Sequence, residues 1–89
     1  MAAPVVLVHG FGGSPGEWVA VAGILRDARH EVRAPPLPGH GARAGTPFRV
    51  GPAVEGIAEA IEACPAPPIL VGRGLGGHLA VQAAVTGEG

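Results

Sequence analysis

The chain has 89 residues, enough for one small domain, and 47% of them are hydrophobic while 15% are charged. The net charge of −1 gives no electrostatic reason to expect nucleic acid or an anionic membrane as a partner. The single cysteine, Cys64, excludes an internal disulfide and is expected to be a partly buried, unreactive thiol. The histidines show no metal-ligand spacing, so we expect neither a metal ion nor a cofactor.

The N-terminus carries no recognisable targeting signal. It lacks a charged leading region, and the apolar run 5–8 is too short for a signal peptide or a membrane span. We therefore expect a cytoplasmic protein without a membrane partner.

Apolar runs alternate with helical patterns along the first half of the chain. The run 4–8 predicts a buried parallel strand because both of its faces are apolar. A helix is predicted from Pro15 to about Ala28, with Ser14 as N-cap and Glu17 completing a capping box. The spacing predicts that its buried face consists of Trp18, Val21, Ala22 and Leu25.

The second half of the chain repeats the alternation. Residues 31–34 predict a second strand, which the following prolines end, and a loop extends to about residue 51. A second helix is predicted from Pro52, a third strand over 69–71 and a third helix over 75–85. This βαβαβα order predicts a single α/β domain over residues 1–89, in which helices cover both faces of a parallel sheet in three layers.

The glycine-rich turn between the third strand and the third helix fits two templates. The first is the Gly-x-Ser-x-Gly nucleophile elbow, with Gly74 where the serine would stand between Gly72 and Gly76. The second is the dinucleotide fingerprint, Gly72-x-Gly74-x-x-Gly77. The acidic residue that would hold the ribose falls beyond residue 89, and two βα units precede the turn. The dinucleotide interpretation is therefore the weaker alternative.

Together with two earlier stretches, this elbow resembles the α/β-hydrolase superfamily. Residues 9–14 (HGFGGS), followed by Trp18, look like the oxyanion loop, and residues 37–41 (LPGHG) look like the loop after the next strand. Both stretches are most similar to the branch containing 2-succinyl-6-hydroxy-2,4-cyclohexadiene-1-carboxylate synthase. The resemblance implies the N-terminal half of a hydrolase fold, with the first strand between the other two and an open edge on the third strand.

The resemblance also implies roles for individual residues. The backbone N–H groups of Phe11 and Leu75 would form the oxyanion hole beside position 74. His9 and His40 are expected to shape their loops rather than transfer protons. The residues that the resemblance places around the site are His9, Gly10, Gly12, Trp18, His40, Arg73 and His78.

Two functional hypotheses follow from the missing nucleophile. Gly74 cannot form an acyl-enzyme, and His78 and Glu88 are the sole candidate acid or base groups after it, so the chain itself should not hydrolyse esters. The first hypothesis is a fragment of a serine-type hydrolase or related lyase acting on a small ester, acyl or C–C substrate. The second is a non-catalytic pseudohydrolase that binds a small acyl ligand, or associates with another chain or with itself through its open sheet edge.

Overall fold

The computed structural model of the chain describes residues 2–87. Three parallel strands, β1 (Val5–Val8), β2 (Val32–Arg33) and β3 (Ile69–Gly72), form one sheet in the order β2-β1-β3. β1 pairs with β3 at four positions and with β2 at two. The predicted parallel sheet with the first strand in the centre is therefore confirmed.

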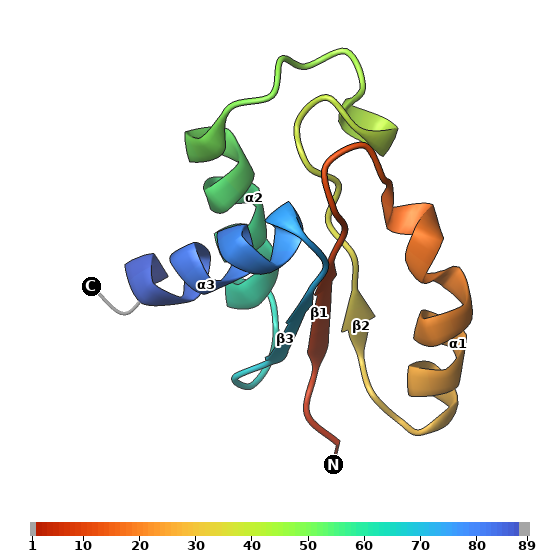
Figure 1. Ribbon diagram of the computed structural model, residues 1–89. Coiled ribbons are helices and arrows are strands. Elements are labelled where there is room, and N and C mark those ends of the chain that lie inside the picture. The colour runs from red at the N-terminus through yellow and green to blue at the C-terminus, as the bar shows by residue number, and fades with distance from the viewer. Residues whose placement is uncertain (1, 88–89) are drawn as a thin grey trace.

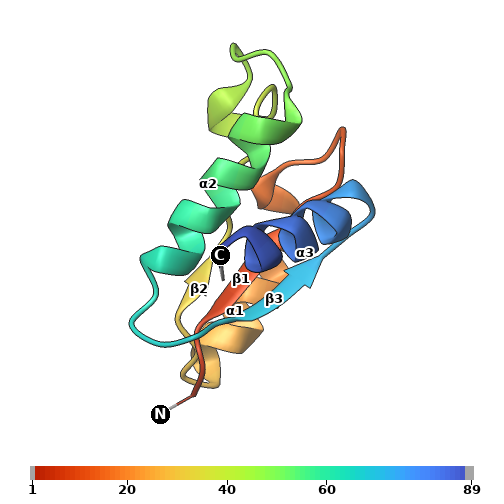
Figure 2. The same cartoon turned by 90° about the vertical axis from the view of Figure 1, so that its left-hand side faces the viewer.

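Helices cover both faces of the sheet, as Figures 1 and 2 show. Successive residues of a strand point to opposite faces, and α1 (Val19–Asp27) packs on the face that carries Val5 and Leu7. The opposite face is covered by α2 (Val50–Glu62) and α3 (Leu75–Gly87). The described part of the chain thus has the three-layer α/β arrangement that the sequence predicts.

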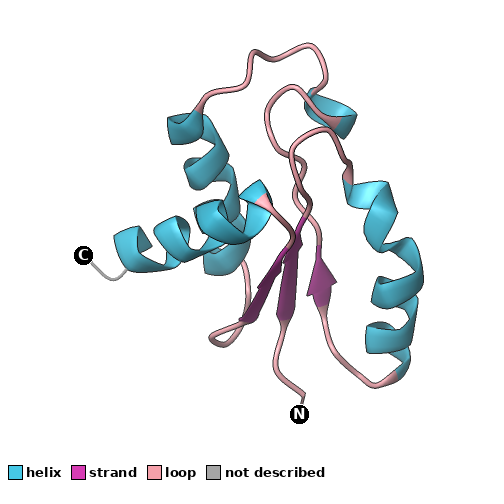
Figure 3. Ribbon diagram, viewed as in Figure 1, coloured by secondary structure: helices cyan, strands magenta, loops and turns pink. Residues whose placement is uncertain are grey.

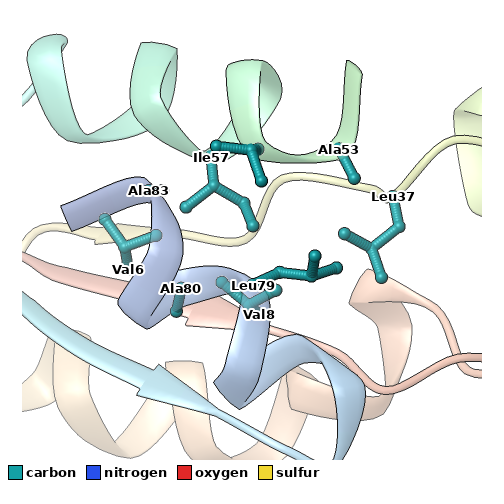
Figure 4. Packing of buried hydrophobic residues seen from close by; sticks show 9 residues of the cluster. Val6, Val8, Leu37, Ala53, Ile57, Leu79, Ala80 and Ala83 are labelled. Carbon is teal, nitrogen blue, oxygen red and sulfur yellow. The ribbon is translucent and has the colours of Figure 1, made fainter. Parts of the chain in front are cut away.

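The hydrophobic core is divided by the sheet into two clusters of unequal size. The cluster under α2 and α3, drawn in Figure 4, consists of Val6, Val8, Leu37, Ala53, Val54, Ile57, Leu79, Ala80 and Ala83. The cluster under α1 consists of Val5, Leu7, Ala22 and Val32. The face with two helices therefore holds most of the buried apolar side chains.

The first predicted helix differs from expectation at its start. Residues Pro15–Trp18 form a 3₁₀ turn before α1, and Ser14 makes no side-chain capping hydrogen bond, so the predicted capping box is wrong. Trp18, Ala22 and Leu25 nevertheless share the face that packs against the cluster under α1, as predicted. Val21, predicted to be buried, is 42% exposed because it lies at the margin of this face.

The remaining differences lie at the ends of elements. α2 begins at Val50, which places Pro52 in the first turn, where its missing N–H costs no intrahelical bond. The long loop between β2 and α2, visible in Figure 3, contains a short 3₁₀ turn at Gly41–Arg43. Cys64 is partly buried as predicted, and its thiol donates to the carbonyl oxygen of Ala60 at 3.3 Å.

Two further properties follow from the described residues. Within the described residues β3 lies at one end of the strand order, as predicted, and its side chains of Ile69 and Val71 are 51% and 38% exposed. None of the helices within residues 2–87 has the length and apolar character needed to cross a bilayer. The cytoplasmic location stays a prediction.

Candidate functional site

Three loops meet beyond the carboxyl ends of the strands, above the sheet in Figure 1. They follow β1, β2 and β3 in turn and comprise residues 9–14, 34–41 and 73–74. Because the strands are parallel, their carboxyl ends lie at one edge of the sheet, where open α/β sheets bind ligands. All three motifs found in the sequence therefore lie in the same region.

The turn from β3 into α3 is packed too closely against its surroundings for side chains on two of its glycines. A Cβ atom on Gly72 would collide with the backbone of Gly77. A Cβ atom on Gly76 would collide with the carbonyl oxygen of His9 and would lie 2.6 Å from that of Val8. The glycines at 72 and 76 are thus required by close approach of the backbone.

Gly74 is a glycine for a different reason. Its φ of +56° is in the left-handed region, but no heavy atom lies within 4 Å of the position that a Cβ would occupy. A side chain at this position would cost backbone strain without any steric clash. The turn therefore leaves open space beside Gly74, and its role as a nucleophile elbow stays a prediction.

A cavity of about 480 Å³ lies beside Gly74. None of the backbone hydrogen bonds in the turns and loops of the described chain uses the N–H groups of Phe11 and Leu75, the two predicted oxyanion donors. Their role stays a prediction, although both residues line this cavity. The lining residues are Gly10, Phe11, Gly12, Gly13, Glu17, Arg73, Gly74 and Leu75.

His9 lies behind the cavity and is completely buried. Its Nε2 accepts the backbone N–H of Leu37 at 3.0 Å, and its Nδ1 lies 2.8 Å from the carbonyl oxygen of Gly10. A backbone N–H can only donate, so Nε2 is unprotonated and Nδ1 carries the hydrogen of a neutral ring. His9 therefore links the loop after β1 to the loop after β2.

His40 makes the reciprocal link. Its Nε2 accepts the backbone N–H of Gly12 at 2.7 Å, and its Nδ1 donates to the carbonyl oxygen of Pro38 at 2.9 Å. The ring centroid of His40 lies 5.2 Å from that of His9 and 5.1 Å from that of Phe11. Each of the two loops thus offers one histidine acceptor to a backbone amide of the other loop.

The cavity has one charged pair on its wall. The Arg73 guanidinium lies 3.8 Å from the Glu17 carboxylate, with side-chain exposures of 72% and 23%. The carboxylate of Glu17 covers Gly13, where a Cβ would collide with it. The sequence assigned Glu17 to a capping box, so its position at the cavity was missed. An exposed pair at this distance contributes little to stability.

Two residues expected around the site lie elsewhere. Trp18 is half-buried and packs against the cluster under α1, and His78 is exposed on the first turn of α3. Neither lines the cavity, because Trp18 belongs to the 3₁₀ turn that packs against the α1 side of the sheet. Glu88, the other candidate partner after Gly74, lies outside the described residues.

No group of three or more metal-ligating side chains occurs among the residues that the structure describes.

A family model described as "Alpha/beta hydrolase family" matches residues 5–88, nearly the whole chain. The protein therefore belongs to the alpha/beta hydrolase family. Comparisons with curated proteins and with solved structures gave no match.

Proposed function

We propose that the chain supplies the oxyanion loop and the nucleophile elbow of a serine-type hydrolase or related lyase site for a small ester, acyl or C–C substrate. The observation that carries this proposal is the conformation of the elbow. Gly72 and Gly76 have no room for side chains, whereas Gly74 is left-handed and faces open space. A sharp, strained turn between a strand and a helix presents the serine in α/β-hydrolases, and among the glycines 72, 74 and 76 of this turn only Gly74 has room for a side chain.

Under this proposal, the chain with glycine at position 74 has no hydrolase activity of its own. Gly74 has no oxygen that could attack a carbonyl, and a catalytic acid and histidine follow the nucleophile in the chain order of this fold. Removing the nucleophile from a well-studied serine protease costs on the order of 10⁶ in kcat. The oxyanion donors are main-chain groups, so they do not depend on the side chain at position 74.

A finer assignment within the family rests on the two loop motifs. The stretches 9–14 and 37–41 are most similar to the branch containing 2-succinyl-6-hydroxy-2,4-cyclohexadiene-1-carboxylate synthase, and we propose that the site derives from that branch. An arginine often follows the elbow glycines in this branch, but here the position holds His78, which is exposed and does not line the cavity. The proposal therefore does not include an anionic substrate.

The test is a fusion protein that restores the missing groups. Residues 1–89 carrying Gly74→Ser would be joined to the C-terminal half of an active α/β-hydrolase, which supplies the acid and the histidine. We expect turnover of a p-nitrophenyl ester from this fusion, and none above buffer from the 89-residue Gly74→Ser chain alone. The matched controls are the fusion with Gly74 unchanged and the fusion with Gly23→Ser, which adds a serine at an open helical glycine. A folded Gly74→Ser fusion without turnover would contradict the proposal.

A second candidate function is association with another copy of the chain through β3. The N–H groups of Ile69 and Arg73 donate to β1, so those of the alternate residues Leu70 and Gly72 point away from it. Apolar side chains are exposed on both sides of this edge: those of Ile69 and Val71, and those of Val81 and Val85 on α3, each 65% exposed. An open apolar edge of this kind is a template for strand pairing.

Sedimentation of the purified chain tests the association. We expect a dimer that Val71→Lys disrupts, because the lysine places a charge beside the pairing strand. Val19→Lys is the matched control, since Val19 is 71% exposed but lies on α1. A monomeric wild-type chain, or equal effects of the two substitutions, would refute the β3 interface.

A further inference from the structure

We propose that His40 is a positioning residue for the oxyanion loop, and that the loop keeps its conformation only while the His40 ring is neutral. The significance of this positioning for catalysis rests on the proposed function. The hydrogen bond between His40 and the loop does not depend on that function, because it is a property of the folded chain. This bond links residues 9–14, which include the predicted donor Phe11, to residues 37–41.

The link is a hydrogen bond between a backbone amide of one loop and a ring nitrogen of the other. The N–H of Gly12 donates to His40 Nε2 at 2.7 Å, across 28 positions of the chain. This N–H belongs to the peptide that joins Phe11 to Gly12, so the bond fixes the orientation of that peptide. Gly12 has a φ of +86° and no neighbour within 4 Å of a Cβ position, so side-chain packing does not hold it there. Within the turn the Gly13 N–H donates to the carbonyl oxygen of Gly10, and the imidazole supplies the restraint from outside the turn.

The ring is itself held in one orientation. Its Nδ1 donates to the Pro38 carbonyl oxygen at 2.9 Å, which fixes the hydrogen on Nδ1 and leaves Nε2 as the acceptor. The aromatic rings that surround it come from two other segments of the chain, the loop 9–14 and the stretch before α2. They are those of His9, Phe11 and Phe48, with centroids 5.2, 5.1 and 6.2 Å from that of His40.

A second proton on His40 would break the link. Protonated Nε2 is a donor, so it would face the Gly12 N–H with no lone pair to offer. His30 provides a contrast within the same chain. Its Nδ1 lies 2.7 Å from the carbonyl oxygen of Ala3, and a protonated ring keeps that bond because Nδ1 remains a donor. Acidification should therefore release the contact of His40 and spare that of His30.

The charged groups of the adjoining elements do not compensate a positive charge on His40. Glu17 and Arg73, across the cavity, pair with one another, and the Arg43 guanidinium approaches Gly56 on α2. His9, the other titratable group facing the ring, already accepts the Leu37 N–H and uses its Nδ1 for Gly10. Within residues 2–87, no carboxylate forms an ion pair with His40.

Nuclear magnetic resonance of the ¹⁵N-labelled chain tests the proposal without any catalytic assay. At pH 8 we expect the two-bond ¹H–¹⁵N spectrum to show His40 with its hydrogen on Nδ1. As the pH is lowered from 8 to 5, the Gly12 amide resonance should shift with the same midpoint as the His40 ring. The protection of this amide against exchange should fall about tenfold, as the loss of one hydrogen bond predicts.

Three variants separate positioning from a merely structural role. His40→Gln keeps an acceptor that does not titrate, so the protection of Gly12 should persist and become independent of pH. His40→Ala should remove the protection at every pH, whereas His30→Gln should leave the wild-type titration of Gly12 unchanged. If His40→Ala does not fold, comparison of the wild-type and His40→Gln titrations still shows whether the neutral His40 ring holds the Gly12 amide.

Several results would overturn the inference. The first is a His40 ring that carries its hydrogen on Nε2 at pH 8. The second is a Gly12 amide resonance that does not change as His40 titrates. The third is a Gly12 amide protection that still depends on pH in His40→Gln. An inactive serine-restored fusion, in contrast, would count against the proposed function and leave these spectra unaffected.

Discussion

Two glycines of the elbow, Gly74 and Gly76, should respond very differently to a methyl group. In Gly76→Ala the new Cβ meets the carbonyl oxygens of His9 and Val8, both main-chain atoms that cannot rotate away. We expect a loss of about 3 kcal/mol in the free energy of unfolding, the upper part of the range for overpacking. In Gly74→Ala the new Cβ meets nothing, and the left-handed φ of +56° alone costs about 1 kcal/mol.

Urea and thermal unfolding measure this difference. For a domain of this size each kcal/mol corresponds to roughly 4–8 °C in Tm, so Gly76→Ala should unfold more than about 10 °C below wild type. Gly74→Ala and Gly74→Ser should each remain within about 10 °C of it. Gly23→Ala is the control: it lies inside α1 with open surroundings, and alanine should stabilise that helix by about 0.5–1 kcal/mol.

The outcome bears directly on the interpretation of position 74. If Gly74→Ser destabilised the chain as much as Gly76→Ala, position 74 could not have accommodated a nucleophile, and the elbow geometry described above would be wrong. If Gly76→Ala were tolerated within about 1 kcal/mol, the close approach of the elbow to β1 would be refuted.

Two further substitutions test the core and the cavity wall. Ile57→Ala removes a side chain that is 1% exposed beneath α2 and should cost about 2–5 kcal/mol in urea unfolding, whereas a change below 1 kcal/mol would mean that α2 packs differently. Arg73→Gln removes the exposed partner of Glu17 and should change the free energy of unfolding by less than about 0.5 kcal/mol at both low and high salt. A larger, salt-sensitive loss would show that the ion pair is tighter than 3.8 Å in solution.

The sequence predicted the architecture well because the relevant signals are local. The apolar run of β1 marks a strand buried on both faces, and the glycines at 72, 74 and 76 mark a tight turn between a strand and a helix. The structure shows that these glycines are needed for different physical reasons. The sequence cannot distinguish the reasons, since a steric clash of a Cβ and a positive φ both favour glycine. The pattern thus located the elbow without explaining it.

The cross-loop contacts could not be predicted from local patterns. Leu37 lies in a proline-rich stretch that indicates only a loop, yet it is 1% exposed and its N–H reaches His9, 28 residues away. Glu17 matched a capping box, but a 3₁₀ turn directs its carboxylate toward Gly13 and Arg73. Both outcomes depend on how the loops pack together, a tertiary effect that outweighs local preference.

The unequal division of the core also determines which part of the molecule opens first. Ala22 is the one buried residue of α1, while Ile24 and Val19 are about 70% exposed, so little apolar area resists detachment of this helix. Segments with few buried contacts unfold locally at a fraction of the global free energy. The loop 9–14 leads directly into the turn before α1, so it would lose its distal attachment when α1 detaches. During such fluctuations, the bonds from Gly12 to His40 and from Leu37 to His9 still join this loop to the loop after β2.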